Sequence, residues 1–80
     1  MASERVERLT RKEIITAGKK FKSSRESAKW TVIVEGQEFP ARPLLLFAAG
    51  VAPNDPTNSH MAVKKLKREG FETLYEGKPV

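Results

Sequence analysis

The chain has 80 residues, with 15 lysines and arginines, 10 aspartates and glutamates, one histidine and no cysteine. This length fits one small domain, and the lack of cysteine excludes a disulfide framework, a thiolate nucleophile and a cysteine-based zinc site. The single histidine excludes the metal motifs that need two, and no apolar run approaches the roughly 20 residues of a membrane span. The charged start of the chain is unlike a signal peptide, so we expect a cytoplasmic protein.

The positive charge is concentrated in the first third of the sequence. Residues 1–29 contain 9 lysines and arginines against 4 glutamates, a net charge of +5, whereas residues 30–80 contain 6 basic and 6 acidic residues. An uneven basic charge is typical of proteins that contact a polyanion, most simply nucleic acid. A basic surface that only promotes solubility is the alternative.

The first predicted element is a helix over residues 11–21. Thr10 and Glu13 match a capping box, in which each side chain accepts a hydrogen bond from the backbone of the other residue. The polar segment 22–27 after the helix predicts a loop. Residues 1–9 before it are expected to be a flexible end.

A β-hairpin is predicted next. Residues 30–35 are rich in β-branched side chains and alternate as a half-buried strand does. Gly36 suits a tight turn, and residues 38–40 return as a second strand that ends at Pro40. Trp30 opens the first strand on the same side as two valines, and we expect it in the core rather than exposed for stacking on a base.

Two further helices are predicted around a loop. Residues 43–49 form a short apolar helix, with Pro43 at its first position and Gly50 at its left-handed end. Residues 51–57 contain prolines and polar residues and predict a loop. The third helix then runs over residues 60–69.

The end of the chain predicts a last strand. Gly70 and Phe71 match a Schellman ending of the third helix, and residues 71–75 alternate as a strand that joins the hairpin. Residues 77–80 are expected to be flexible. The sequence therefore predicts one α+β domain over residues 1–80, with a small antiparallel sheet packed with three short helices in the order α-β-β-α-α-β.

The second and third helices, with the 51–57 loop between them, resemble a helix-turn-helix, whose second helix reads bases in the major groove. Thr57, Asn58 or Ser59 caps the third helix, and a capped helix start with free N–H groups also suits a phosphate. Two helices packed around a core, with no DNA contact, are the alternative. The residues of this helix predicted to contact DNA are Asn58, Ser59, His60, Lys64 and Lys67.

A second basic region lies at the end of the first helix and in the loop after it. Lysines there suit sequence-independent phosphate contacts, or they complement the C-terminal end of the helix. Arg42, between two prolines, is predicted to contact a phosphate or a base edge, or else to pair with Glu38 or Glu35. The predicted phosphate contacts of this region are Lys19, Lys20, Lys22 and Arg25.

No combination of residues predicts catalysis. His60 has no acidic residue at helical spacing to orient it, and Ser23 and Ser24 have no base beside them. We therefore expect a protein that is not an enzyme, with no cofactor, no metal site and no small-molecule substrate.

A longer pattern runs from about Thr10 to Tyr75. It consists of Trp30-Thr-Val-Ile-Val-Glu-Gly36, Phe39-Pro-Ala-Arg42, an apolar run that ends at Ala48-Ala-Gly50, and Leu66-Lys-Arg-Glu-Gly-Phe-Glu72. In these residues the chain resembles the small N-terminal head domain of modification-dependent restriction endonucleases, which precedes DNA-reading and HNH nuclease domains. The resemblance implies a DNA-associated module of a restriction–modification system. No nuclease motif is present, so cleavage would belong to another protein.

Together these features predict a non-catalytic module that binds DNA, most simply a duplex, through phosphate contacts and groove contacts of the third helix. One alternative is a protein-interaction module, such as a small phage or bacterial defence regulator that docks on a larger protein. Its signal would be an exposed apolar patch, with Leu74 and Tyr75 on an open edge strand. The other alternative is RNA binding, for which aromatic side chains exposed on the sheet are expected.

Overall fold

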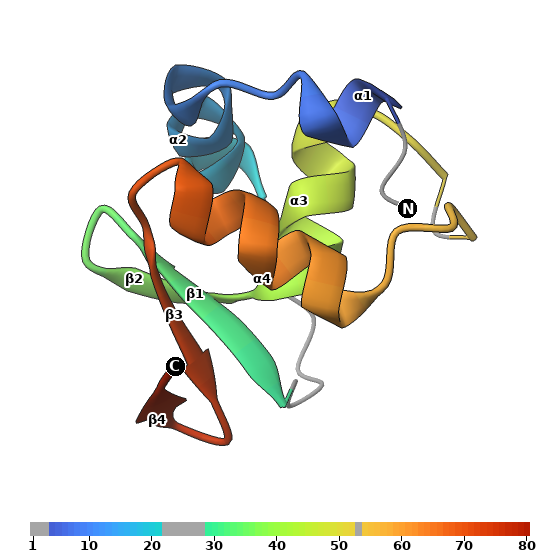
Figure 1. The fold of residues 1–80 in the computed structure, drawn as a ribbon. Helices are drawn as coiled ribbons and strands as arrows, with labels where there is room; N and C mark the ends of the chain where they lie inside the picture. Colours follow the sequence, from blue (N-terminus) through green and yellow to red (C-terminus); the bar gives the residue numbers. More distant parts are fainter. Residues whose placement is uncertain (1–3, 22–28, 53) are drawn as a thin grey trace.

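The computed structural model describes residues 4–21, 29–52 and 54–80. Along these residues four helices and four strands form a small domain (Figure 1). The α+β class was predicted, with one helix and one strand fewer. The sheet is antiparallel, with the strand order β2-β1-β3-β4. The elements are α1 (Glu4–Glu7), α2 (Arg11–Lys20), β1 (Trp30–Val34), β2 (Gln37–Pro40), α3 (Ala41–Ala49), α4 (Ser59–Arg68), β3 (Glu72–Tyr75) and β4 (Lys78–Pro79).

Helix α1 was not expected from the sequence. Residues 1–9 were predicted to be a flexible end, but Glu4–Glu7 form one helical turn in which Val6 is fully buried. Leu9, just after the turn, is buried in the same core. A single turn is too short to be stable alone, so its packing against α3 and α4 must stabilise it.

Helix α2 starts where the sequence predicts. The Thr10 hydroxyl accepts a hydrogen bond from the backbone N–H of Glu13 (3.2 Å), and the Glu13 carboxylate accepts one from the backbone N–H of Thr10 (3.1 Å). This confirmed capping box satisfies two of the donors that a helix start leaves free. Ile14 and Ala17 are buried on the inner side of the helix. The predicted loop over residues 22–27 lies outside the described residues.

Strands β1 and β2 form the predicted hairpin. Val34 pairs with Gln37, so the loop between the strands contains only Glu35 and Gly36, with φ angles of 51° and 79°. Positive φ at both positions is the mark of a type I′ turn, whose twist matches that of antiparallel strands.

Strand β3 joins the hairpin as predicted, and a further short strand follows it. β3 pairs with β1, with Trp30 opposite Tyr75. Glu76 and Gly77 then form a second turn with positive φ angles (50° and 82°), and β4 pairs back on β3. Residues 77–80 were expected to be flexible, so β4 is an addition to the predicted fold.

Helix α3 begins at Ala41, two residues before the predicted start at Pro43. Pro43 is therefore the third residue of the helix. A proline fits there because the first four backbone N–H groups of a helix have no partner within it. Gly50 ends the helix in the left-handed conformation (φ 69°), as predicted.

Helix α4 ends in the predicted Schellman motif. The backbone N–H of Phe71 donates to the carbonyl oxygen of Leu66 (3.1 Å), and the N–H of Gly70 donates to that of Lys67 (3.0 Å). Gly70 has a φ of 89°, which a residue with a side chain rarely adopts. Phe71 and Leu66 are both buried, as the motif requires.

Two long-range ties hold α4 to the start of the chain. Nη1 of Arg11 donates to the carbonyl oxygen of Glu69 (2.7 Å), and its guanidinium lies 4.5 Å from the centre of the Phe71 ring. Lys65 is only 4% exposed, and its Nζ donates to the carbonyl oxygen of Glu7 (2.8 Å) and to the Glu69 carboxylate (3.3 Å). The carbonyl at the C-terminal end of α1 is a favourable partner for a buried ammonium group.

Helices α3 and α4 cover one face of the sheet (Figure 1). Val32, Val34 and Phe39 point to this side and are buried. Thr31 and Ile33 point to the other face and are half-buried. No helix in the described part of the chain is long and apolar enough to cross a membrane.

Candidate nucleic-acid interface

Helix α4 divides its basic side chains into two groups. Lys65 is buried in the contact with α1, whereas Lys64 and Lys67 are exposed. Lys64 and Lys67 lie on the same side of the helix, about 4.5 Å apart along its axis. Arg68 is also exposed, but its Nη2 pairs with the carboxylate of Glu7 (3.3 Å). The exposed side of α4 therefore offers two lysines that form no ion pair with any described residue.

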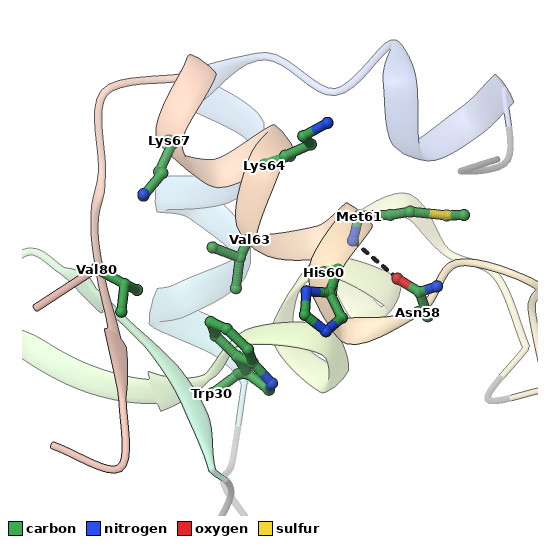
Figure 2. A pocket seen from close by; sticks show the side chains of 8 residues that line it. All are labelled: Trp30, Asn58, His60, Met61, Val63, Lys64, Lys67 and Val80. Atoms are coloured by element: carbon green, nitrogen blue, oxygen red, sulfur yellow. Dashed lines mark hydrogen bonds between the residues drawn. The ribbon is translucent and has the colours of Figure 1, made fainter. Parts of the chain in front are cut away.

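A hollow of about 470 Å³ lies beside these lysines (Figure 2). The lysines lie on its α4 side, and the indole of Trp30 lies on the side of the sheet. Ser59, which was also predicted to contact DNA, is the first residue of α4 and is half-buried outside the lining. Four residues predicted to contact DNA line this hollow: Asn58, His60, Lys64 and Lys67.

Asn58 is the cap of α4. Its side-chain Oδ1 accepts a hydrogen bond from the backbone N–H of Met61 (2.9 Å), drawn as a dashed line in Figure 2. Of the other two predicted cap candidates, Thr57 is fully buried and Ser59 already belongs to the helix. Asn58 thereby satisfies one N–H group that has no partner within the helix. It is itself exposed and lines the hollow.

Trp30, on the sheet side of the hollow, belongs to an aromatic cluster. Its ring packs against the rings of Tyr75 on β3 (centroids 4.4 Å apart) and of His60 on α4 (5.0 Å). The sequence predicted Trp30 in the core, and the structure places it half-buried at the edge of the core. Met61, Val63 and Val80 complete the apolar part of the lining. Sequence reasoning missed these three as site residues, because the packing of α4 on β1 and the pairing of β3 with β1 and β4 bring them beside Trp30.

Arg42 lies elsewhere and has a structural role. Its Nε donates to the carbonyl oxygen of Thr57 (2.6 Å), and its Nη2 donates to that of Asp55 (3.0 Å). Neither bond is the predicted contact with Glu38 or Glu35. Arg42 thereby holds the loop that leads into α4, and its side chain lines a different hollow from the one beside Lys64.

The first basic region is separate from the α4 hollow. Lys19 and Lys20 are exposed at the end of α2, and Lys19 lines a small hollow together with Val34 and Phe39. This hollow shares no residue with the one beside α4. The two other members of the region, Lys22 and Arg25, lie outside the described residues. Lys19 therefore lines a different hollow from Lys64 and Lys67, in keeping with the two basic regions expected from the sequence.

The other face of the sheet, which no helix of the described residues covers and which we call the uncovered face, carries acidic side chains where α4 carries lysines. Its side chains include Thr31, whose hydroxyl donates to the Glu38 carboxylate (2.7 Å), and Ile33, which pairs with Glu38 and with Glu72. Leu74 on β3 is half-buried on the same face. In the described strands the aromatic residues all point to the helix side, so this face lacks the exposed rings expected of an RNA-binding sheet.

The apolar patch expected for a protein-interaction module is also in a different place. Leu74 and Tyr75 lie on β3, which is paired with β1 on one side and β4 on the other, so they are not on an open edge strand. Besides Val80 (48% exposed), the exposed large apolar side chain among the described residues is that of Phe47 on α3 (47%). Its ring packs against that of Phe21 (centroids 5.4 Å apart) beside a hollow of about 310 Å³.

No family model, no curated protein and no solved structure matches the chain. The resemblance to the head domain of modification-dependent restriction endonucleases therefore stays a prediction. Function has to be inferred from the side chains on α4 and around it.

Proposed function

We propose that this protein is a non-catalytic DNA-binding module that contacts phosphates through the exposed side of α4. The observation that carries the proposal is the position of His60, Lys64 and Lys67 on one side of a single helix, around one hollow. Such side chains donate to phosphate oxygens whatever the base sequence. From His60 to Lys67 the helix advances about 10 Å, which is the rise of about three nucleotides in one strand of B-DNA.

The acidic side chains on the sheet also favour binding of DNA on the side of α4. Glu38 and Glu72 lie on the uncovered face, and Glu35 and Glu76 are exposed in the two turns. A polyanion is repelled by these carboxylates and attracted by the lysines of α4. The net charge of +5 therefore favours DNA on the helix side more than its modest size suggests.

Contacts with the rest of the chain fix α4, which supports the proposal. The helix is capped by Asn58, tied by Lys65 to α1 and tied at its end by Arg11. A helix fixed in advance loses little conformational entropy when it binds. Because the major groove of B-DNA admits a helix, we also propose groove contacts from Asn58 and His60 at the start of α4.

The experiment measures the affinity for a labelled DNA duplex by fluorescence anisotropy over a series of salt concentrations. Each neutralised phosphate contributes about −0.9 to the slope of log affinity against log salt. We expect a wild-type slope near −3, and a slope shallower by about 2 in the variant Lys64→Gln/Lys67→Gln. The matched control is Lys19→Gln/Lys20→Gln, which loses the same charge from α2 and should change the slope by less than one contact.

Two results would contradict the proposal. Negligible binding of the duplex at low salt would contradict the binding of duplex DNA by this surface. An equal loss of slope in the α2 variant and the α4 variant would show that the contact follows net charge rather than the exposed side of α4.

A protein-interaction module is the second candidate, and the exposure of Phe47 beside its hollow favours it. Such exposed aromatic side chains are enriched in protein interfaces. The variant Phe47→Ser separates the two functions, because it should leave the affinity for DNA and its salt dependence unchanged. A loss of DNA binding in this variant, with the fold intact, would place the DNA contact on α3.

A further inference from the structure

The hollow beside α4 contains more than phosphate contacts need. Its sheet side is the half-buried indole of Trp30, and Val63 and Val80 extend this apolar surface. Val80 is 48% exposed although it is apolar. Lys64 and Lys67 line the hollow on the side of α4, so an aromatic surface and two lysine side chains border one small space; in Figure 2 the Lys64 ammonium group is turned away from Trp30.

Trp30 is already held in one orientation. Its ring contacts Tyr75 at 4.4 Å and His60 at 5.0 Å, and its backbone belongs to β1 in the middle of the sheet. An indole fixed in this way can stack on a flat ligand without losing further side-chain freedom. The ligand that fits must therefore have a flat ring and an adjacent negative charge.

A nucleotide has both parts. Bases stack on aromatic side chains in proteins that bind single strands, and this contact tolerates any base because each has a π face. The volume of about 470 Å³ falls within the range of small-molecule sites. A base within a duplex is stacked between its neighbours and cannot enter such a hollow, so the base must be unpaired.

We infer that the hollow binds one unpaired base of single-stranded DNA on the Trp30 ring, with the neighbouring phosphates on Lys64 and Lys67. This inference rests on the proposed function and adds to it the form of DNA that the site selects. The phosphate contacts hold the strand along α4. The stacking of the base on Trp30 makes the site prefer single-stranded DNA to a polyanion that has no bases.

The test compares two oligomers of equal length and equal charge, oligothymidylate and the abasic deoxyribose-phosphate chain. We expect the wild-type protein to bind oligothymidylate about 5- to 150-fold more tightly, as one stacked base does. Trp30 is the only tryptophan of the chain, so its fluorescence reports on the hollow directly. Oligothymidylate should quench it, and the abasic oligomer should not.

The outcomes separate the two proposals. Equal affinity for both oligomers, with the expected salt dependence, would overturn the inference and leave phosphate binding by α4 intact. No binding of either oligomer or of the duplex would overturn both. The variants Trp30→Phe and Trp30→Leu, each checked for an unchanged fold by circular dichroism, test the role of the ring. Phenylalanine should retain part of the preference for oligothymidylate, and a full preference in the leucine variant would overturn the inference.

Discussion

Replacing Gly70 with alanine should destabilise the end of α4 in two ways, by backbone strain and by displacing the side chain of Arg11. Gly70 has a φ of 89°, and a Cβ added there would lie 2.9 Å from Nη1 of Arg11. Gly36, in the first hairpin turn, has a φ of 79°, but a Cβ there would meet no atom within 4 Å. Gly36→Ala therefore introduces backbone strain alone, whereas Gly70→Ala introduces similar strain and displaces Arg11.

The sizes of the two effects follow from these contacts. An L-residue in the left-handed region costs about 1–2 kcal/mol, which is the expected loss of unfolding free energy for Gly36→Ala. At Gly70 the displaced Arg11 also loses its hydrogen bond to Glu69 (2.7 Å) and its contact with the Phe71 ring (4.5 Å). For an exposed guanidinium these contacts contribute about 1.5 and 0.5 kcal/mol, so Gly70→Ala should cost about 3–4 kcal/mol in total.

Urea unfolding, followed by the fluorescence of Trp30, measures both variants. The decisive comparison repeats them in the Arg11→Ala background, where nothing remains to be displaced. There the difference of about 2 kcal/mol between Gly70→Ala and Gly36→Ala should disappear. An equal cost of the two variants in the wild-type background would refute the role of Arg11, and so would a difference that persists without it.

Three further variants test the other ties in the fold by the same unfolding measurement. Val6→Ala should lower the free energy of unfolding by about 2 kcal/mol, because it removes two buried methyl groups and leaves a cavity; no change would mean that α1 is not packed as described. Lys65→Met keeps the buried stem but loses the bond to the Glu7 carbonyl (2.8 Å), so it should cost about 1–3 kcal/mol, and a gain in stability would contradict this. Thr10→Ala breaks the capping box with Glu13 and should cost about 1 kcal/mol, whereas Thr10→Ser should cost much less.

The parts of the fold that were predicted correctly depend on neighbours in sequence. The capping box of Thr10 and Glu13 involves residues three apart, and Gly36 can form its turn whatever the rest of the chain does. The Schellman ending at Phe71 likewise needs only one turn of helix before it. Each of these patterns has one favoured local conformation, so its residues suffice to predict it.

The parts that were missed depend on distant residues. Val6 is buried only because α3 and α4 lie against α1, and the burial of Lys65 needs the carbonyl of Glu7 beside it. The second hairpin was also missed, but for another reason. Glu76 and Gly77 repeat the Glu-Gly pair of the first turn, so this turn could have been predicted from the sequence in the same way.

In the candidate site, too, the local features could be predicted from the sequence and the long-range contacts could not. Lys64 and Lys67 could be placed on the outside of a helix from their spacing alone. The contact of Trp30 with His60 could not be predicted, since it joins residues from the start of a strand and the start of a helix through the packing of α4 on the sheet. The two basic regions were expected to be separate, and in the structure Lys19 and the α4 lysines line different hollows.

The two ties from the start of the chain to α4 have a consequence for how the protein folds. The bonds from Arg11 to Glu69 and from Lys65 to Glu7 each join residues 58 positions apart. Closing a loop of that length costs roughly 3–4 kcal/mol of chain entropy. Once one bond has closed the loop, the other forms at little further cost, so the two should form together. Folding should then be slower than the helical content suggests, with α4 reaching its final position only when both ends of the chain meet.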